Sequence, residues 1–296
     1  MSVLSLARTR LGASPWLPVA TLAAAMLSFQ YGAATAEGLF PSVGAQGATA
    51  LRISLAALML APIMRPWRIR VTRKTLPPLL AYGASLGGMN LLFYMALRTT
   101  PLGVAVALEF VGPLGVAVAT SRRWHDFACV GLALAGLLLL LPIGREVAAV
   151  DATGALFALG AGGCWALYIV FGQMAGHEHG PAAAAFGMAV ATLIALPVGL
   201  LHAGLHLFAP ALIPTALLVA VFSSALPYSL EMVSLTRLPA RTYGVLTSME
   251  PASGALMGLV LLHERLSVRQ LVAILAVMLA SVWATLSVRR RLVPPE

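Results

Sequence analysis

Three acidic residues and one arginine lie inside long apolar segments of the 296-residue chain: Glu109, Glu231, Glu250 and Arg52. An ionised side chain at the centre of a membrane helix costs about 2.5–3.5 kcal/mol on insertion scales, so residues of this kind usually serve a function. A buried carboxylate can exchange a proton for the ammonium group of a ligand. A guanidinium can hold a carboxylate at two points. We therefore take these four residues as candidates for ligand binding and proton exchange.

The four candidates differ in their depth along the segments. Glu109 and Glu250 lie near the middle, where they can also act as protonated spacers that hydrogen-bond neighbouring helices. Arg52 lies nearer the outer end, and its alternatives are an ion pair with Glu37 or extension to the outer headgroups. Glu231 falls near the end of its segment, where we expect its carboxylate to reach water at the mouth of a cavity on the cytoplasmic side.

Neutral polar residues in the same segments can complete such a site, or can hydrogen-bond one helix to another. They are Gln30, Asn90, Tyr168 and Tyr228, followed by Gln173, Ser223, Ser224, Thr247 and Ser248. Two prolines, Pro113 and Pro251, stand close to Glu109 and Glu250 and remove a backbone hydrogen bond each. They predict a kink or hinge beside each acid.

The composition excludes a soluble protein. Hydrophobic residues make up 60% of the chain and charged residues only 10%, against about 25% charged in soluble domains. Neither cysteine has metal-ligand spacing, no phosphate-binding or hydrolase motif occurs, and the histidines lie in loops or at the ends of apolar segments. We therefore expect no cofactor, no metal and no enzymatic activity. The net charge of +9 is scattered between apolar segments, so it does not predict nucleic-acid binding.

Hydropathy predicts an all-α integral membrane protein, because about 20 apolar residues cross a bilayer as a helix. Ten segments qualify, with short loops marked by proline, glycine or charge. They are Leu17–Ala36, Gly47–Met64, Leu79–Leu97, Leu102–Thr120, Phe127–Leu141, Thr153–Met174, Ala182–His202, Ala211–Leu235, Thr242–Leu262 and Val268–Ser287.

The chain matches itself at a shift of 138 residues. This shift aligns four rarer pairs besides apolar ones: Pro101 with Pro239, Pro113 with Pro251, His125 with His263, and Asp126 with Glu264. It predicts two five-helix repeats, residues 1–145 and 146–296, within one transmembrane unit. Because five is odd, the second repeat must be inverted, which is typical of transporters. Glu250 aligns with Gly112, one helical turn after Glu109, so both acids should face one central cavity.

Positive charge predicts the orientation in the membrane. Fourteen Lys and Arg residues fall on the side of the N-terminus and four on the other side, which puts both termini in the cytoplasm. The alternative is that Arg8, Arg10 and the apolar run from Leu17 form a cleaved signal peptide. Cleavage would leave nine segments and break the repeat.

Several runs of the chain are similar to the EamA-type drug/metabolite transporters, in particular to the threonine/homoserine exporter branch. They are Ser85–Tyr94 (SLGGMNLLFY), Pro101–Pro113 (PLGVAVALEFVGP), Gly160–Tyr168 (GAGGCWALY), Ala225–Glu231 (ALPYSLE), Leu238–Tyr243 (LPARTY) and Ser248–Pro251 (SMEP). One departure is His263, where the broad family has glycine before the acid.

The resemblance implies ten helices in two inverted halves and residence in the bacterial inner membrane. It also implies export of small amino acids by antiport against protons, with the lipid bilayer as the other partner. The alternative is a transporter of the same fold that exports another metabolite or a drug; an intramembrane enzyme or a channel is the least favoured reading. The sequence does not determine the oligomeric state.

The charge asymmetry makes a topological prediction. Reporter fusions after Arg70, Arg122 and Arg290 should report cytoplasm, and fusions near Gly44, Arg145 and Arg265 should report the outside. An extracytoplasmic signal after Arg122 would overturn the ten-segment topology.

Overall fold

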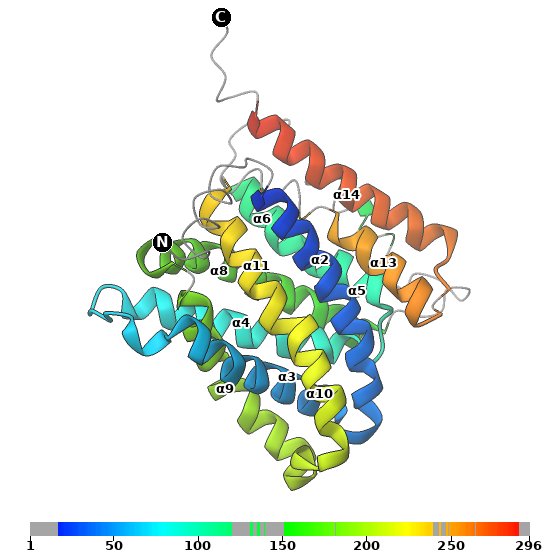
Figure 1. Ribbon diagram of the computed structural model, residues 1–296. Helices are drawn as coiled ribbons and strands as arrows, with labels where there is room; N and C mark the ends of the chain where they lie inside the picture. Colours follow the sequence, from blue (N-terminus) through cyan, green and yellow to red (C-terminus); the bar gives the residue numbers. More distant parts are fainter. Residues whose placement is uncertain are drawn as a thin grey trace, which may run out of the picture.

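The computed structural model describes residues 17–119, 131–132, 135–136, 139, 151–180, 182–238, 243, 247, 249–263 and 265–289. In this part of the chain the regular structure is entirely helical (Figure 1), which confirms the predicted all-α class there. The α-helices are α2 Leu17–Ala36, α3 Phe40–Met64, α4 Leu76–Ala96, α5 Leu102–Glu109, α6 Val111–Ala119, α8 Ala152–His179, α9 Ala182–Ala203, α10 Ile213–Ala220, α11 Leu226–Arg237, α13 Glu250–Leu261 and α14 Val268–Arg289. Short 3₁₀ turns cover η1 Glu37–Leu39, η2 Pro66–Arg68, η3 Gly204–Phe208 and η4 Pro210–Leu212, and a π-helical turn covers η5 Val221–Ala225.

Within the described ranges, five helical stretches are long and apolar enough to cross a membrane: Leu17–Met64, Leu76–Ala96, Ala152–His179, Ala182–Phe208 and Pro210–Ser234. The first holds both α2 and α3; η1 lies between them, and the chain bends again inside α3 at Gly44, whose φ is 68°. Glycine suits that bend because other residues rarely adopt a positive φ. Most of the fifth predicted segment, the start of the ninth and several repeat matches (Pro239, His125, Asp126 and Glu264) lie outside the described residues.

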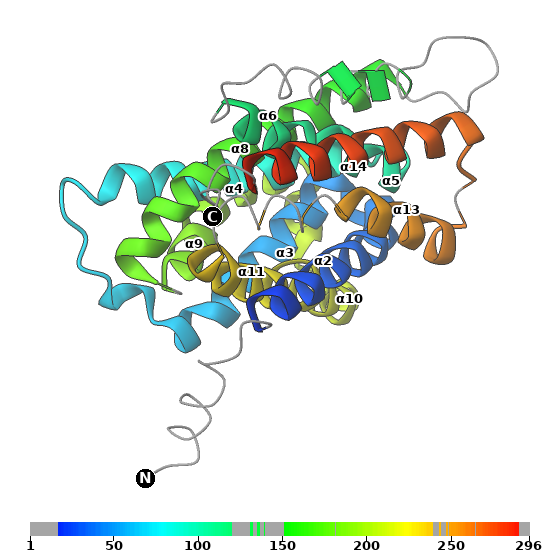
Figure 2. The same cartoon turned by 90° about the horizontal axis from the view of Figure 1, so that it is seen from above.

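Helices that are distant in sequence pack side by side. In both views α2 lies along α11, while α4 packs against α8 and α9, and α3 against α9 (Figures 1 and 2). The short helix α5 packs against α13 and α8, and α14 lies over α5 and α6. Residues from both halves of the chain therefore meet at the centre of the bundle.

The fourth predicted segment is not one continuous helix. It divides at Phe110 into α5 and α6, which we attribute to Pro113. Proline has no N–H for the carbonyl four residues earlier, and its ring crowds that carbonyl, which here belongs to Glu109. Pro251 instead lies in the first turn of α13, where proline is readily accommodated. Both prolines thus stand at helix ends beside an acidic residue.

The eighth predicted segment is also interrupted. It consists of α10, the π-turn η5 and α11, so the helix predicted over residues 211–235 changes its hydrogen-bond pattern near its centre, next to Pro227. A π-turn inserts one extra residue into the helical ladder and changes which side chains share a face.

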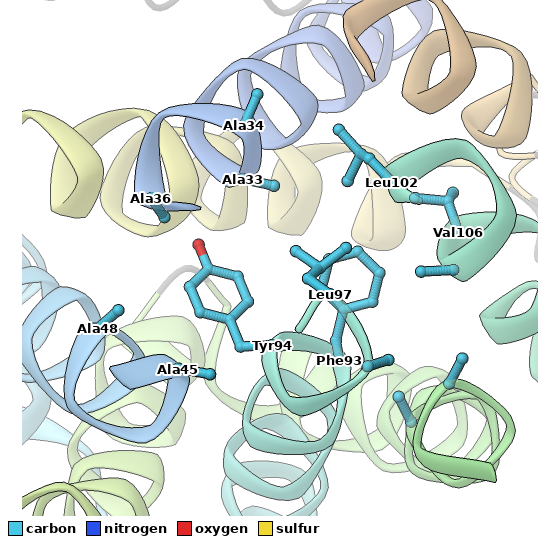
Figure 3. Packing of buried hydrophobic residues seen from close by; sticks show 14 of the residues in the cluster. Ala33, Ala34, Ala36, Ala45, Ala48, Phe93, Tyr94, Leu97, Leu102 and Val106 are labelled. Carbon is cyan, nitrogen blue, oxygen red and sulfur yellow. The ribbon is translucent and has the colours of Figure 1, made fainter. Parts of the chain in front are cut away.

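Small residues let the helices approach closely. In Figure 3 the Tyr94 side chain reaches from α4 between labelled alanines of α2 and α3, which belong to the same buried cluster. The contact between α6 and α8 is tighter. A Cβ on Gly112 would collide with the carbonyl oxygen of Gly162, and a Cβ on Gly162 would collide with the carbonyl oxygen of Glu109.

This contact predicts that Gly162→Ala destabilises the protein, whereas Gly163→Ala does not. Overpacking a close contact costs about 1–3 kcal/mol. The neighbouring Gly163 has open space around its Cβ position and is the matched control. Thermal unfolding in detergent should show a lower midpoint for Gly162→Ala only. Equal midpoints for both variants would contradict the close approach of α8 to α5 and α6.

Candidate functional site

A cavity lined by several charged and polar side chains lies among the helices of both halves. Helices α2, α3, α4, α5, α11 and α13 and the π-turn all contribute to its lining. The structure brings together eight of the predicted site residues on its wall: Gln30, Arg52, Asn90, Glu109, Ser223, Tyr228, Glu231 and Glu250. Tyr168 lies next to this set, as described below.

Arg52 is buried, with 2% of its surface exposed, and its guanidinium donates to neutral acceptors. Nη1 donates to the backbone oxygen of Ser223 (2.8 Å), to Ser223 Oγ (2.8 Å) and to Ser224 Oγ (3.0 Å), and Nη2 donates to Asn90 Oδ1. The alternative in which Arg52 extends to the outer headgroups is therefore wrong. The side chain is instead fixed at the cavity wall by α4 and the π-turn.

The ring of Tyr94 contacts the same guanidinium. The Arg52 Cζ atom lies 4.2 Å from the centroid of the Tyr94 ring, a cation–π distance, and Tyr94 Oη lies 3.0 Å from Ser223 Oγ. Tyr94 was absent from the predicted site. Its position one helical turn after Asn90 puts both residues on one face of α4, and this spacing is the signal that would have found it.

Asn90 joins the two halves of the chain. Its Nδ2 donates to the backbone oxygen of Leu86 (2.7 Å) and to Tyr228 Oη (2.7 Å). Asn90 and Tyr228 are separated by 138 residues, which is the shift of the predicted repeat. The Phe29 ring packs edge-on against Tyr228, with their centroids 4.7 Å apart, and holds it in place.

Glu109 and Glu250 face the cavity from two different helix ends. Glu109 is the last residue of α5 and Glu250 the first of α13, with 8% and 7% of their surfaces exposed. Within the described part of the chain neither carboxyl group makes a side-chain hydrogen bond. The alternative role as hydrogen-bonded spacers therefore has no support there, and both carboxyl groups are available to a ligand in the cavity.

Glu231 differs from its expected place. It lies well inside α11 with 4% of its surface exposed, so the expectation of a carboxylate in contact with water at a cavity mouth is wrong. Tyr168 Oη donates to Oε2 (3.2 Å) and Tyr243 Oη donates to Oε1. Tyr243 was also missed, although it lies within the LPARTY run. The eighth segment ends later than predicted, which moves Glu231 inward.

In the part of the chain that the structure describes, two side chains that line the cavity each have a buried atom without a hydrogen-bond partner: Arg52 Nε, a donor, and Gln30 Oε1, an acceptor. A buried polar group without a partner costs about 1–3 kcal/mol, so such atoms point to a bound ligand or water. A small solute with both an acceptor and a donor would satisfy them. Among the described residues no group of three His, Cys, Asp or Glu side chains is arranged to hold a metal ion.

The fold and the cavity together define a helical membrane protein with a cavity lined by charged and polar side chains between its helices. Comparisons with known proteins agree with this class. The sequence profile of the EamA-like transporter family matches residues 152–286. By this match and by the relatives described next, the chain belongs to the EamA-like transporter family, whose members are transporters and not enzymes. It is therefore a multi-pass membrane protein.

The similar proteins are named as exporters. Over 275 residues the chain is 54% identical to the threonine/homoserine exporter RhtA of Escherichia coli (strain K12) and to that of Salmonella typhimurium (strain LT2). In each case the match covers 93% of both chains. A solved structure described only as "Crystal structure of protein" is 20% identical, with a TM-score of 0.58, and covers 95% of this chain and 99% of its own. That likeness concerns the fold alone.

Proposed function

We propose that the protein exports small amino acids of the threonine and homoserine type across the bacterial inner membrane, in exchange for protons. The names of the relatives support this cargo. The observation that carries the proposal is the pair of unpartnered atoms in the cavity wall, the Arg52 Nε donor and the Gln30 Oε1 acceptor. A zwitterionic amino acid offers an acceptor group and a donor group on one small molecule.

The carboxylate of the substrate binds Arg52 in this proposal. Nη1 and Nη2 already donate to Ser223, Ser224 and Asn90, so these bonds orient the guanidinium and leave Nε for the substrate. An arginine whose fork is held in place loses less conformational entropy when it binds a carboxylate.

The ammonium group of the substrate binds near Gln30 Oε1 and the carboxyl groups of Glu109 and Glu250. Facing the cytoplasm, a deprotonated carboxylate accepts the ammonium. Facing outside, a proton displaces the ammonium and resets the transporter. Glu231 takes a different part, because Tyr168 and Tyr243 already occupy its two oxygens. We assign it to the electrostatic balance of the cavity rather than to direct exchange.

Alternating access follows from the proposed ten helices in two inverted repeats. Under the shift of 138, α2 corresponds to α8 and α4 to the stretch from α10 to α11. The packing of α2 on α11 is thus the counterpart of the packing of α8 on α4. Helices α3 and α9 are equivalent under this shift and pack against each other. Asn90 and Tyr228 are also equivalent and are hydrogen-bonded. Contacts between equivalent positions are expected near a twofold axis. Pro113 and Pro251 are the proposed hinges, and the charge asymmetry supports cytoplasmic termini.

The substrate proposal predicts that Arg52→Lys weakens transport. Proteoliposomes with the wild-type protein should exchange labelled threonine and homoserine. In Arg52→Lys we expect the KM to rise about tenfold or more, because an ammonium cannot reproduce the planar fork of the guanidinium. The variant then lacks about one charge-assisted hydrogen bond to the substrate. The exposed Arg98, changed to Lys, is the matched control.

Two results would count against the substrate proposal. Wild-type transport by both Arg52→Lys and Arg52→Gln would remove Arg52 from the binding site. If the wild-type protein exchanges neither amino acid, the cargo is another metabolite or a drug.

The proton proposal predicts that Glu109→Gln, Glu250→Gln or both abolish efflux driven by a pH gradient. Glutamine keeps the size and polarity of the side chain but cannot release a proton. The variants should still insert and should retain substrate counterflow without a gradient, which separates coupling from folding. Exposed Glu178, changed to Gln, is the matched control. Full pH-driven efflux in both single variants and in the double variant would eliminate this mechanism.

A further inference from the structure

The π-turn η5 lies directly against the cavity, and a proline follows it. In a π-turn each carbonyl accepts from the N–H five residues later. Leu226 N–H donates to the carbonyl of Val221 in this way. The next donor in the ladder would be residue 227, which is Pro227 and has no N–H. The hydrogen-bond ladder of the helix is therefore interrupted at a defined place.

The π-turn and Pro227 together leave two carbonyl groups short of a backbone partner, because the extra residue of the turn leaves one carbonyl over and the missing N–H of Pro227 leaves another. The carbonyl of Phe222 would accept from residue 227 in π geometry, and that of Ser223 would accept from residue 227 in α geometry. Both find substitutes from other helices. Ser28 Oγ of α2 donates to the Phe222 oxygen at 2.6 Å, and Arg52 Nη1 of α3 donates to the Ser223 oxygen at 2.8 Å.

The same turn gives Arg52 most of its acceptors. Ser223 supplies its backbone oxygen and its Oγ, and Ser224 supplies its Oγ. In a regular α-helix consecutive side chains are about 100° apart, so the widened turn helps both serines to reach one guanidinium. Gly32 of α2 allows this arrangement, because a Cβ there would lie about 2.5 Å from the Cβ and backbone N of Ser223.

We infer that Pro227 is a positioning residue for substrate recognition: it frees the Ser223 carbonyl to orient Arg52, so that Nε faces the substrate carboxylate. The inference rests on the proposed function of Arg52. Pro227 does not touch the substrate, and its contribution passes through the guanidinium. A proline that only bends the helix would have no selective effect on carboxylate binding.

The test restores the missing donor with Pro227→Ala. The new N–H can take the Ser223 or the Phe222 carbonyl back into the helix, which weakens the hold on Arg52. In threonine counterflow we expect the KM to rise about tenfold, equivalent to one charge-assisted hydrogen bond, with little change in maximal rate. Inhibition by threonine should weaken, whereas inhibition by threoninamide, which lacks the carboxylate, should hold.

The matched control is Pro197→Ala, which restores a donor in the middle of α9 at an exposed position away from the cavity. A wild-type KM in Pro227→Ala, or an equal loss of inhibition by threonine and threoninamide, would overturn the inference.

A second measurement does not depend on the cargo. In thermal unfolding, Arg52→Gln should lower the midpoint less in the Pro227→Ala background than in the wild type, because the two residues act through one hydrogen bond. Additive shifts would overturn the inference. If the wild-type protein transports no amino acid, the proposed function fails, and this unfolding cycle alone decides on Pro227.

Discussion

The structure depends on one constraint: a permanently charged guanidinium inside a membrane bundle needs hydrogen-bond acceptors. Arginine keeps its proton in proteins, so Arg52 must be given acceptors where it lies. The bundle supplies them from Asn90 on α4 and from the two serines of the π-turn, and the Tyr94 ring makes a cation–π contact with the guanidinium. Each of these groups is neutral. These hydrogen bonds therefore orient the positive charge without neutralising it, and the acidic residues that line the same cavity supply the opposite charge.

The three acids of the cavity share a location but not an environment. Glu231 is held by two tyrosine hydroxyls, whereas the described residues offer no side-chain hydrogen bond to the carboxyl groups of Glu109 and Glu250. Three carboxylates beside one guanidinium would leave a strong negative excess in a medium of low dielectric constant. Protons or a cationic group must therefore reduce this excess. This requirement is the physical basis of the exchange of substrate for protons that we propose.

The proposed repeat is symmetric in its packing but not in its chemistry. The position that matches Arg52 is Val190, which lies against Gly83 of α4, and the position that matches Gly83 is Val221 at the start of the π-turn. The position that matches Pro227 is Met89, which has a normal backbone N–H. Of the two matching positions Val190 and Arg52, the first thus packs as an apolar side chain against a glycine, and the second is a buried arginine held by polar groups.

The sequence alone determined the membrane class, most helix positions and the list of buried polar residues, because hydropathy measures what each residue costs in lipid and that cost is local. It also predicted that Glu109 and Glu250 share a cavity. The tertiary structure decided what the list could not show: that Glu231 is enclosed by Tyr168 and Tyr243, that Tyr94 supports Arg52, and that a π-turn interrupts the eighth segment. These features depend on partners far away in the chain; Arg52 bonds residues 38, 171 and 172 positions away. Which of many possible acceptors satisfies a buried donor is set by helix packing, and the spacing of residues along one segment does not contain that information.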